Sequence, residues 1–168
     1  MDSLGPRERI LNARVATLLN EILKGFPAAV LGENCRETSP KTDKYNCIAW
    51  AAGDDSRQWD PRTQYYPYTY WPRRAPAGHT VEAIEATFLV HLGYARTDND
   101  RTEHGIEKVA IFADAEGRPM HMARQLRSGT WTSKLGEDED IEHSSLSVLE
   151  GGDYGRVALV LARPLRDD

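Results

Sequence analysis

Cysteine is scarce in this sequence, which has only Cys35 and Cys47 among 168 residues. A scaffold held together by several disulfide bonds is therefore excluded. The sequence also lacks an apolar run of the roughly 18 residues that a membrane span requires. Its polar first residues lack the apolar core of a signal peptide. We therefore expect a cytoplasmic protein with no membrane partner.

Positive charge is also in short supply, because 21 Lys and Arg residues stand against 26 Asp and Glu residues. A protein dedicated to nucleic acid would need a basic surface, so no nucleic-acid partner is expected. The hydrophobic fraction of 40% and the charged fraction of 28% are typical of a soluble globular protein. The length corresponds to one domain, and we assign residues 1–168 to it because no repeat or linker divides them.

Three stretches carry the signals of helices. Apolar residues recur every three to four positions over residues 7–24, which predicts an amphipathic helix that covers one face of the core. A short helix is expected to begin at Cys47 and to end before Gly53, because Asn46 is a good N-cap and alanine favours helix. A further helix is expected over residues 80–92.

The second half of the chain changes to the two-residue alternation of strands. Residues 25–46 look mostly irregular, and we expect the acidic residues 137–140 to form a solvated loop. Helices followed by strands predict an α+β domain, with N-terminal helices packed on an antiparallel sheet over residues 107–163. The predicted strands are residues 108–113, 120–126, 130–135 and 154–161.

Cys47 is the first candidate for chemistry. A thiol at the start of a helix lies at the positive end of the helix dipole, which lowers its pKa and favours the nucleophilic thiolate. The alternative is a buried structural cysteine. A cysteine nucleophile also needs a basic partner, which is usually distant in sequence.

His121 is the candidate partner. On its predicted strand it faces Phe112 across a hairpin and shares a face with Ala123 and Gln125. The alternative is a half-buried histidine without a catalytic role. A third polar group should orient the imidazole, and the sequence leaves its identity open. Four candidates follow in the chain: Ser133, Lys134, Asp140 and His143.

Other kinds of site have no support in the sequence. No spacing among the cysteines and histidines resembles a zinc site, and no glycine-rich phosphate loop follows a strand. We therefore expect neither a metal nor an organic cofactor.

Aromatic residues and prolines are dense over residues 56–78. Rings this dense bury large areas, so the stretch is either an ordered loop wrapped over the core or one wall of a substrate groove. In the second case residues 59–72 line the groove. The candidate substrate contacts are Asn46, Trp50, Tyr70, Trp71 and Lys134.

Two motifs carry a resemblance to known families. Tyr45-Asn46-Cys47-Ile48-Ala49-Trp50-Ala51 resembles the Tyr-Asp-Cys-Ser-Gly segment that opens the catalytic helix of NlpC-type cysteine peptidases, which are papain-like. The block from Val109 to His143 is similar to a family of bacterial proteins of unknown function that pairs it with Asn-Cys-Ile-Ala-Trp-Ala and Tyr-Trp-Pro segments. This block contains Met120-His121-Met122-Ala123-Arg124-Gln125-Leu126 and Trp131-Thr132-Ser133-Lys134-Leu135-Gly136. The resemblance covers most of residues 45–163.

The resemblance implies a papain-like fold with Cys47 as nucleophile and His121 as base. It implies a hydrolase or acyl-transferase that acts on a peptide or on a small amide, ester or thioester. The backbone N–H of Cys47 would stabilise the oxyanion, with the Asn46 side chain as a further donor. The second hypothesis is a papain-like binding or scaffold module without catalysis, with the aromatic loop 59–72 as its interface.

Two departures from the NlpC-type pattern bear on these roles. Ile48-Ala49 replaces the Ser-Gly that follows the cysteine. In NlpC-type enzymes the catalytic histidine often begins the strand, where this sequence has Lys108. In that alignment His121 takes the place of the orienting residue and the base is missing. We favour His121 as the base, because it completes a cysteine–histidine pair.

Overall fold

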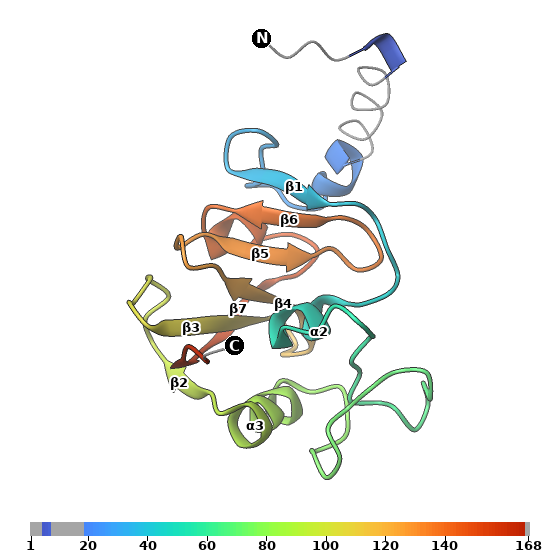
Figure 1. Cartoon of the computed structure of the whole chain (residues 1–168), viewed down its shortest axis with the longest axis vertical. Helices are drawn as coiled ribbons and strands as arrows, with labels where there is room; N and C mark the ends of the chain where they lie inside the picture. The colour runs from blue at the N-terminus through green and yellow to red at the C-terminus, as the bar shows by residue number, and fades with distance from the viewer. Residues whose placement is uncertain (1–4, 8–18, 167–168) are drawn as a thin grey trace.

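The computed structural model describes residues 5–7 and 19–166 (Figure 1). Most of the helix predicted over residues 7–24 lies outside the described residues, and residues 19–23 are helical. The described elements are, in chain order, β1 (Cys35–Ser39), α2 (Cys47–Ala52), α3 (Val81–Leu92), β2 (Ala95–Thr97), β3 (Ile106–Ala113), β4 (Pro119–Gln125), β5 (Trp131–Lys134), β6 (Asp140–His143), the 3₁₀ helix η1 (Leu146–Leu149) and β7 (Arg156–Pro164).

The strands form one seven-stranded sheet in the order β1-β6-β5-β4-β3-β7-β2. Every pairing between these strands is antiparallel, so the predicted α+β class with an antiparallel sheet is confirmed. The predicted hairpin is confirmed as well, because His121 on β4 pairs with Phe112 on β3.

Both predicted short helices form where their caps place them. Asn46 caps α2 with its side chain, and Gly53 ends the helix in the left-handed conformation at φ 84°. Thr80 caps α3 in the same way, and Gly93 ends it at φ 76°.

Each face of the sheet has its own hydrophobic cluster. We call one the α2/α3 face, because Val109, Ile111 and Met122 pack there with residues of α2 and α3. On the opposite face, Ala110 and Ala123 pack with residues of segment 19–26 and of η1. The two-residue alternation along β3 and β4 sends neighbouring side chains to these two clusters.

The sheet opens between β4 and β5, and α2 begins there. The two strands pair only at Arg124–Thr132 and Gln125–Trp131, so the first half of β4 is not paired with β5. Helix α2 contacts both strands, and Figure 1 shows it beside β4. The backbone N–H of Met122, in this unpaired half, lies near the Cys47 thiol and favours its thiolate form, which lowers the thiol pKa. The start of α2 is thereby joined to the opening in the sheet.

The structure corrects the predicted sheet and the acidic loop. The sheet runs beyond residues 107–163, because β1 and β2 form its two edges. Strand β1 lies in the stretch predicted as irregular, and its pairing with β6 is what orders it. The prediction of a solvated loop over residues 137–140 was wrong at its end, because Glu139 is 6% exposed and Asp140 is 1% exposed. Asp140 begins the buried strand β6.

Membrane insertion finds no support in the helices. Among the described residues, none of the helices combines the length and the apolar character that crossing a bilayer requires.

Candidate active site

The local structure around Cys47 is built by Asn46. The Asn46 Oδ1 atom accepts hydrogen bonds from the backbone N–H groups of Ala49, at 3.2 Å, and Trp59, at 3.1 Å. Its Nδ2 donates to the Trp59 carbonyl at 2.7 Å. These bonds fasten the start of α2 to the aromatic loop. The Asn46 amide is thus committed to structure, and its suggested role as an oxyanion donor has no support in the geometry.

Cys47 and His121 line the same cavity, although they come from different faces of the sheet. Cys47 begins α2, whereas the His121 ring contacts Phe112 on the opposite face, with 5.4 Å between ring centroids. The cavity lies beside the half of β4 that is not paired with β5, and its volume is about 50 Å³. Its walls are Cys47, Ile48, His79, Ile84, Pro119, Met120, His121 and Met122.

A chain of hydrogen bonds leads away from His121 through the opposite face. The His121 Nε2 atom is 2.9 Å from the Ser133 hydroxyl. That hydroxyl is 2.8 Å from His143 Nε2, and His143 Nδ1 is 2.9 Å from the Ser145 carbonyl oxygen. We call these three side chains the His121–Ser133–His143 relay. Of the four candidates for an orienting group, Ser133 contacts the imidazole directly and His143 contacts Ser133.

The last bond of the relay determines the direction of the others. A carbonyl oxygen only accepts, so His143 Nδ1 carries a proton. Burial lowers the pKa of His143 to about 4, so at neutral pH the ring is uncharged and its Nε2 accepts a proton from Ser133. The Ser133 oxygen can then only accept from His121, and His121 Nε2 is therefore the protonated nitrogen.

His121 Nδ1 is left as an unprotonated nitrogen with no partner. Burial lowers the pKa of His121 well below its ordinary value, and the nearby His143 acts in the same direction. The ring is therefore neutral, with one proton already placed on Nε2. Among the described residues, buried Nδ1 has no hydrogen-bond partner. A buried lone pair without a partner costs free energy, and a proton donor that reaches Nδ1 would relieve that cost.

Tyr154 holds the His121 ring from one side. The two rings are stacked with 4.1 Å between centroids and 6° between planes. Phe26 packs on Tyr154 in turn, at 4.8 Å between centroids. Sequence reasoning missed Tyr154 because it read the residue as part of the last strand, whereas it lies in the turn before β7. An aromatic residue beside the turn glycine Gly155, at φ 71°, was the available signal.

The expected thiolate at Cys47 is not supported. Burial raises the pKa of the Cys47 thiol, and this effect outweighs the backbone N–H groups of Met122, Ile48 and Cys47 that favour the thiolate. The six-residue helix contributes too little to reverse it. The resting pair is therefore a neutral thiol and a neutral imidazole. Proton transfer between them would have to accompany attack on a substrate.

Lys134 and Asp140 belong to another group of contacts. Lys134 is fully buried, its ammonium donates to the Asp138 carbonyl and it lies 5.3 Å from the centroid of the Tyr45 ring. Tyr45 donates a short hydrogen bond to Asp140, and so does Ser39, at 2.5 Å. Neither Lys134 nor Asp140 is in the walls of the Cys47 cavity.

The predicted aromatic contacts also stand outside the walls of this cavity. The Trp50 indole donates to the Thr132 hydroxyl at 3.0 Å. Tyr70 packs edge-on against Trp59 with 4.8 Å between centroids, and the Trp71 indole donates to the Pro76 carbonyl at 2.9 Å. These contacts shape the aromatic loop. His79, which sequence reasoning passed over, is the residue that brings the end of this loop to the cavity.

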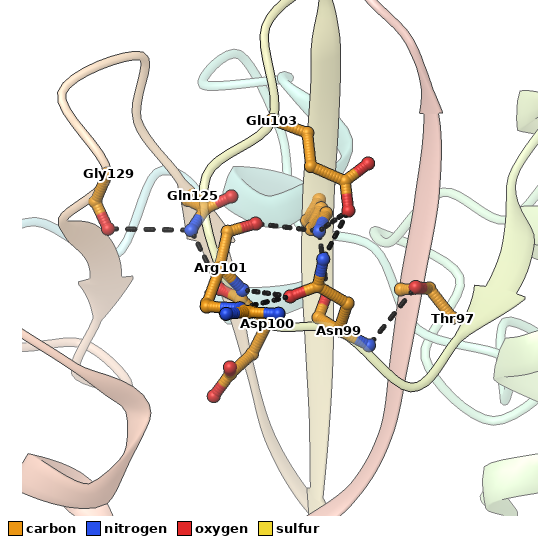
Figure 2. Close-up of polar contacts among 8 residues, drawn as sticks. Thr97, Asn99, Asp100, Arg101, Glu103, Gln125 and Gly129 are labelled. Atoms are coloured by element: carbon orange, nitrogen blue, oxygen red, sulfur yellow. Dashed lines mark hydrogen bonds and ion pairs between the residues drawn. The ribbon is translucent and has the colours of Figure 1, made fainter.

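Lys108 takes the position of the catalytic histidine in the alternative alignment, but its side chain holds a loop in place instead. Its buried ammonium donates to the carbonyls of Asn99, at 2.6 Å, and Arg101, at 2.7 Å, and to the Glu103 carboxylate at 3.0 Å. Figure 2 shows these three partners gathered in one loop, with Gln125 beside them. Lys108 is not in the walls of the Cys47 cavity, so His121 is the buried imidazole beside Cys47.

Metal binding has no support in the described part of the chain. Residues 5–7 and 19–166 contain no group of three or more His, Cys, Asp or Glu side chains arranged to hold a metal ion.

One family model matches the chain. Its description is a domain of unknown function, DUF7689, and the match covers residues 36–162. This range contains Cys47, the whole relay and Tyr154. No curated protein and no solved structure matches the chain.

Proposed function

We propose, for a chain that belongs to the DUF7689 family, that Cys47 and His121 are the nucleophile and base of a cysteine hydrolase or acyl-transferase with a papain-like fold. The observation that carries the proposal is that His121, whose buried Nδ1 has no partner among the described residues, lines the same cavity as Cys47. A buried base and a half-buried nucleophile that line one cavity are the groups that acyl transfer requires.

The chemistry begins with a neutral pair. As the sulfur attacks the substrate carbonyl carbon, the thiol proton moves to His121 Nδ1 and a carbon–sulfur bond forms. The backbone N–H of Cys47, at the open first turn of α2, donates to the oxyanion. When the intermediate collapses, the imidazolium returns its proton to the leaving group and the acyl-enzyme remains.

Release of the acyl group reverses these roles. Water, or an amine in a transfer reaction, gives its proton to His121 Nδ1 while its oxygen or nitrogen attacks the thioester carbon. The carbon–sulfur bond then breaks and the sulfur recovers its proton. Ser133 and His143 are positioning residues in both halves, because they keep the second ring proton on Nε2 throughout. The Tyr154 ring face stabilises the cationic form of His121.

A small thioester tests the proposal without a known substrate. We expect an excess of S-methyl thioacetate, whose leaving group is small, to acetylate Cys47 and to release a burst of one equivalent of methanethiol. Cys47→Ala should abolish the burst. His121→Gln should slow it by about 10²–10⁴-fold, the usual contribution of a general base. Cys35→Ser is the matched control and should keep the burst, because Cys35 lies on β1, away from the cavity. Equal bursts in wild type and His121→Gln would refute the assigned base.

The second candidate is a papain-like binding module without catalysis. The observation that favours it is the exposure of two tyrosines on the aromatic loop, Tyr65 at 72% and Tyr68 at 73%, because exposed rings often anchor interfaces. For this function, the double variant Tyr65→Ala and Tyr68→Ala would abolish binding of a partner, and Cys47→Ala would leave it intact. A burst that depends on Cys47 and His121 would decide against this candidate.

A further inference from the structure

The dimensions of the Cys47 cavity restrict what can reach the sulfur. Its volume is about 50 Å³, which is room for about three or four water-sized groups, because one water needs about 10–15 Å³ of such space. A group of three or four non-hydrogen atoms fits such a space, and a polypeptide segment that continues in both directions does not. The acyl group must therefore enter by its end.

The walls specify the chemistry of that end. The wall residues with polar side chains are Cys47, His121 and His79. All the other wall residues are apolar, and these are Ile48, Ile84, Pro119, Met120 and Met122. A compact polar head on a short apolar stem satisfies both parts, because the stem packs on the aliphatic walls and the head meets the thiol and the base.

The mouth of the cavity is formed by the two wall residues that are most open to solvent. Met120 is 41% exposed, and exposed His79 donates from Nε2 to the Pro119 carbonyl at 3.0 Å. Both are joined to the first residues of β4, so the entrance has a defined position at the start of that strand. Substrate beyond the stem would lie outside this entrance.

We propose that the Cys47 site acts on a terminal carboxamide carried on a short apolar stem, and that it releases ammonia. The inference rests on the proposed cysteine chemistry and names its substrate class. A carboxamide has three non-hydrogen atoms, and its leaving group is small enough to be formed inside the cavity. The same chemical group occurs in the side chain of glutamine within a protein and in small-molecule amides.

The reaction balances with water as the only co-reactant. The Cys47 sulfur bonds to the carboxamide carbon, its proton moves to His121 Nδ1, and the carbon–nitrogen bond breaks as that proton passes to the nitrogen. Ammonia leaves. Water then attacks the thioester carbon, the carboxylic acid forms and the thiol is restored.

Alkylation of Cys47 tests the size limit independently of turnover. Iodoacetamide carries a terminal carboxamide, and N-phenyl iodoacetamide carries the same group blocked by a ring. After normalisation to free cysteine, we expect iodoacetamide to modify Cys47 at least about 100-fold faster, as a tight pocket rejects an oversized group. Ile84→Ala enlarges the cavity and should reduce this ratio. Val90→Ala, at a residue of α3 that is 78% exposed, is the matched control and should leave it unchanged.

A ratio near one in the wild type would overturn the size limit and leave the cysteine chemistry standing. If neither reagent modifies Cys47 while both modify free cysteine, the proposed function fails as well.

Ammonia release then separates the two sources of the carboxamide. A glutamine-rich protein such as β-casein and the small amide N-acetylglutamine are the two substrates. Release of ammonia from either one by wild type, and not by Cys47→Ala, supports the proposal and identifies the source. Hydrolysis of an N-acetylglutamine p-nitroanilide, with no ammonia from either substrate, would overturn it.

Discussion

Replacing Ser133 by alanine removes the hydroxyl that links the two imidazoles of the relay. The variant therefore tests how much the stability of the protein and the reactivity of His121 depend on that link. The Ser133 side chain is fully buried and is bonded to His121 at 2.9 Å and to His143 at 2.8 Å. Both partners are themselves buried, so neither ring nitrogen can turn to solvent when the hydroxyl is removed. The variant leaves a buried N–H donor on one side and a buried acceptor on the other.

The expected loss of stability follows from these two orphaned groups. Each buried polar group without a partner costs about 1–3 kcal/mol, so we expect Ser133→Ala to lower the free energy of unfolding by about 2–6 kcal/mol. The neighbouring Thr132 is a matched control on the other face of the same strand. Its hydroxyl accepts one bond from Trp50 at 3.0 Å, and Thr132→Ala should cost about 1 kcal/mol.

Urea unfolding measures the two losses, and the thioester burst measures the effect on the base. Without Ser133 the His121 ring can carry its proton on either nitrogen, so the burst should slow by at least about tenfold. Thr132→Ala should keep the wild-type rate. The assignment of the relay is refuted if Ser133→Ala loses no more stability than Thr132→Ala and keeps the full burst rate.

Three further predictions concern the surroundings of the relay. Tyr154→Leu removes the ring stacked on His121 at 4.1 Å and should lower the His121 pKa further, as measured by NMR titration. Tyr154→Phe should keep the wild-type pKa. Equal His121 pKa values in wild type and Tyr154→Leu would disprove the stabilising effect of the stacked ring. The folded-state pKa of His143 is lowered from 6.5 to about 4, so the unfolded chain binds the extra proton first. His143 alone should therefore lower the stability by about 3 kcal/mol as the pH drops from 6.5 to 4. The lowered pKa of His121 adds a loss of the same sign, so His143→Gln should keep a shallower slope in urea unfolding, and an undiminished slope would contradict this. Lys108→Met leaves two carbonyls unpaired and should lower the free energy of unfolding by about 2–6 kcal/mol. Cys47 should still react with iodoacetamide at the wild-type rate, and a changed rate would favour the alignment that gives Lys108 the histidine position.

The sequence was sufficient to predict structural features that depend only on residues close together in the chain. Asn46 and Gly53 mark the two ends of α2, and the turn after Phe112 brings His121 into register across the hairpin. In each case a cap, a glycine or a short turn determines the geometry within a few residues.

Features that depend on distant parts of the chain could not be predicted in this way. Strand β1 is ordered by β6, through pairs such as Cys35–His143, and five residues with few apolar side chains do not indicate a strand by themselves. The pKa of Cys47 is another example, because the helix start predicts a lowered value and burial in the folded chain raises it. The contact of Tyr154 with His121 likewise exists only after the sheet has formed.

The sequence also could not predict which groups donate and which accept in the hydrogen bonds of the relay. Ser133 and His143 were among four possible orienting groups, and their spacing alone does not separate them from Lys134 and Asp140. The alternation of side chains along β5 and β6 places Ser133 and His143 on one face of the sheet and Lys134 and Asp140 on the other. Only the contact of His143 with the Ser145 carbonyl then determines which nitrogen of His121 is free.

The protonation of His121 is the most direct test of the account, because the proposed base exists only if Nδ1 is bare. ¹⁵N NMR of histidine-labelled protein at pH 7 reports the two ring nitrogens separately. We predict a protonated Nε2 and an unprotonated Nδ1 for His121. Nδ1 should gain the thiol proton when Cys47 adds to acetaldehyde and forms a tetrahedral hemithioacetal whose oxygen keeps the negative charge. A His121 ring that carries its proton on Nδ1 in the free protein would contradict the account.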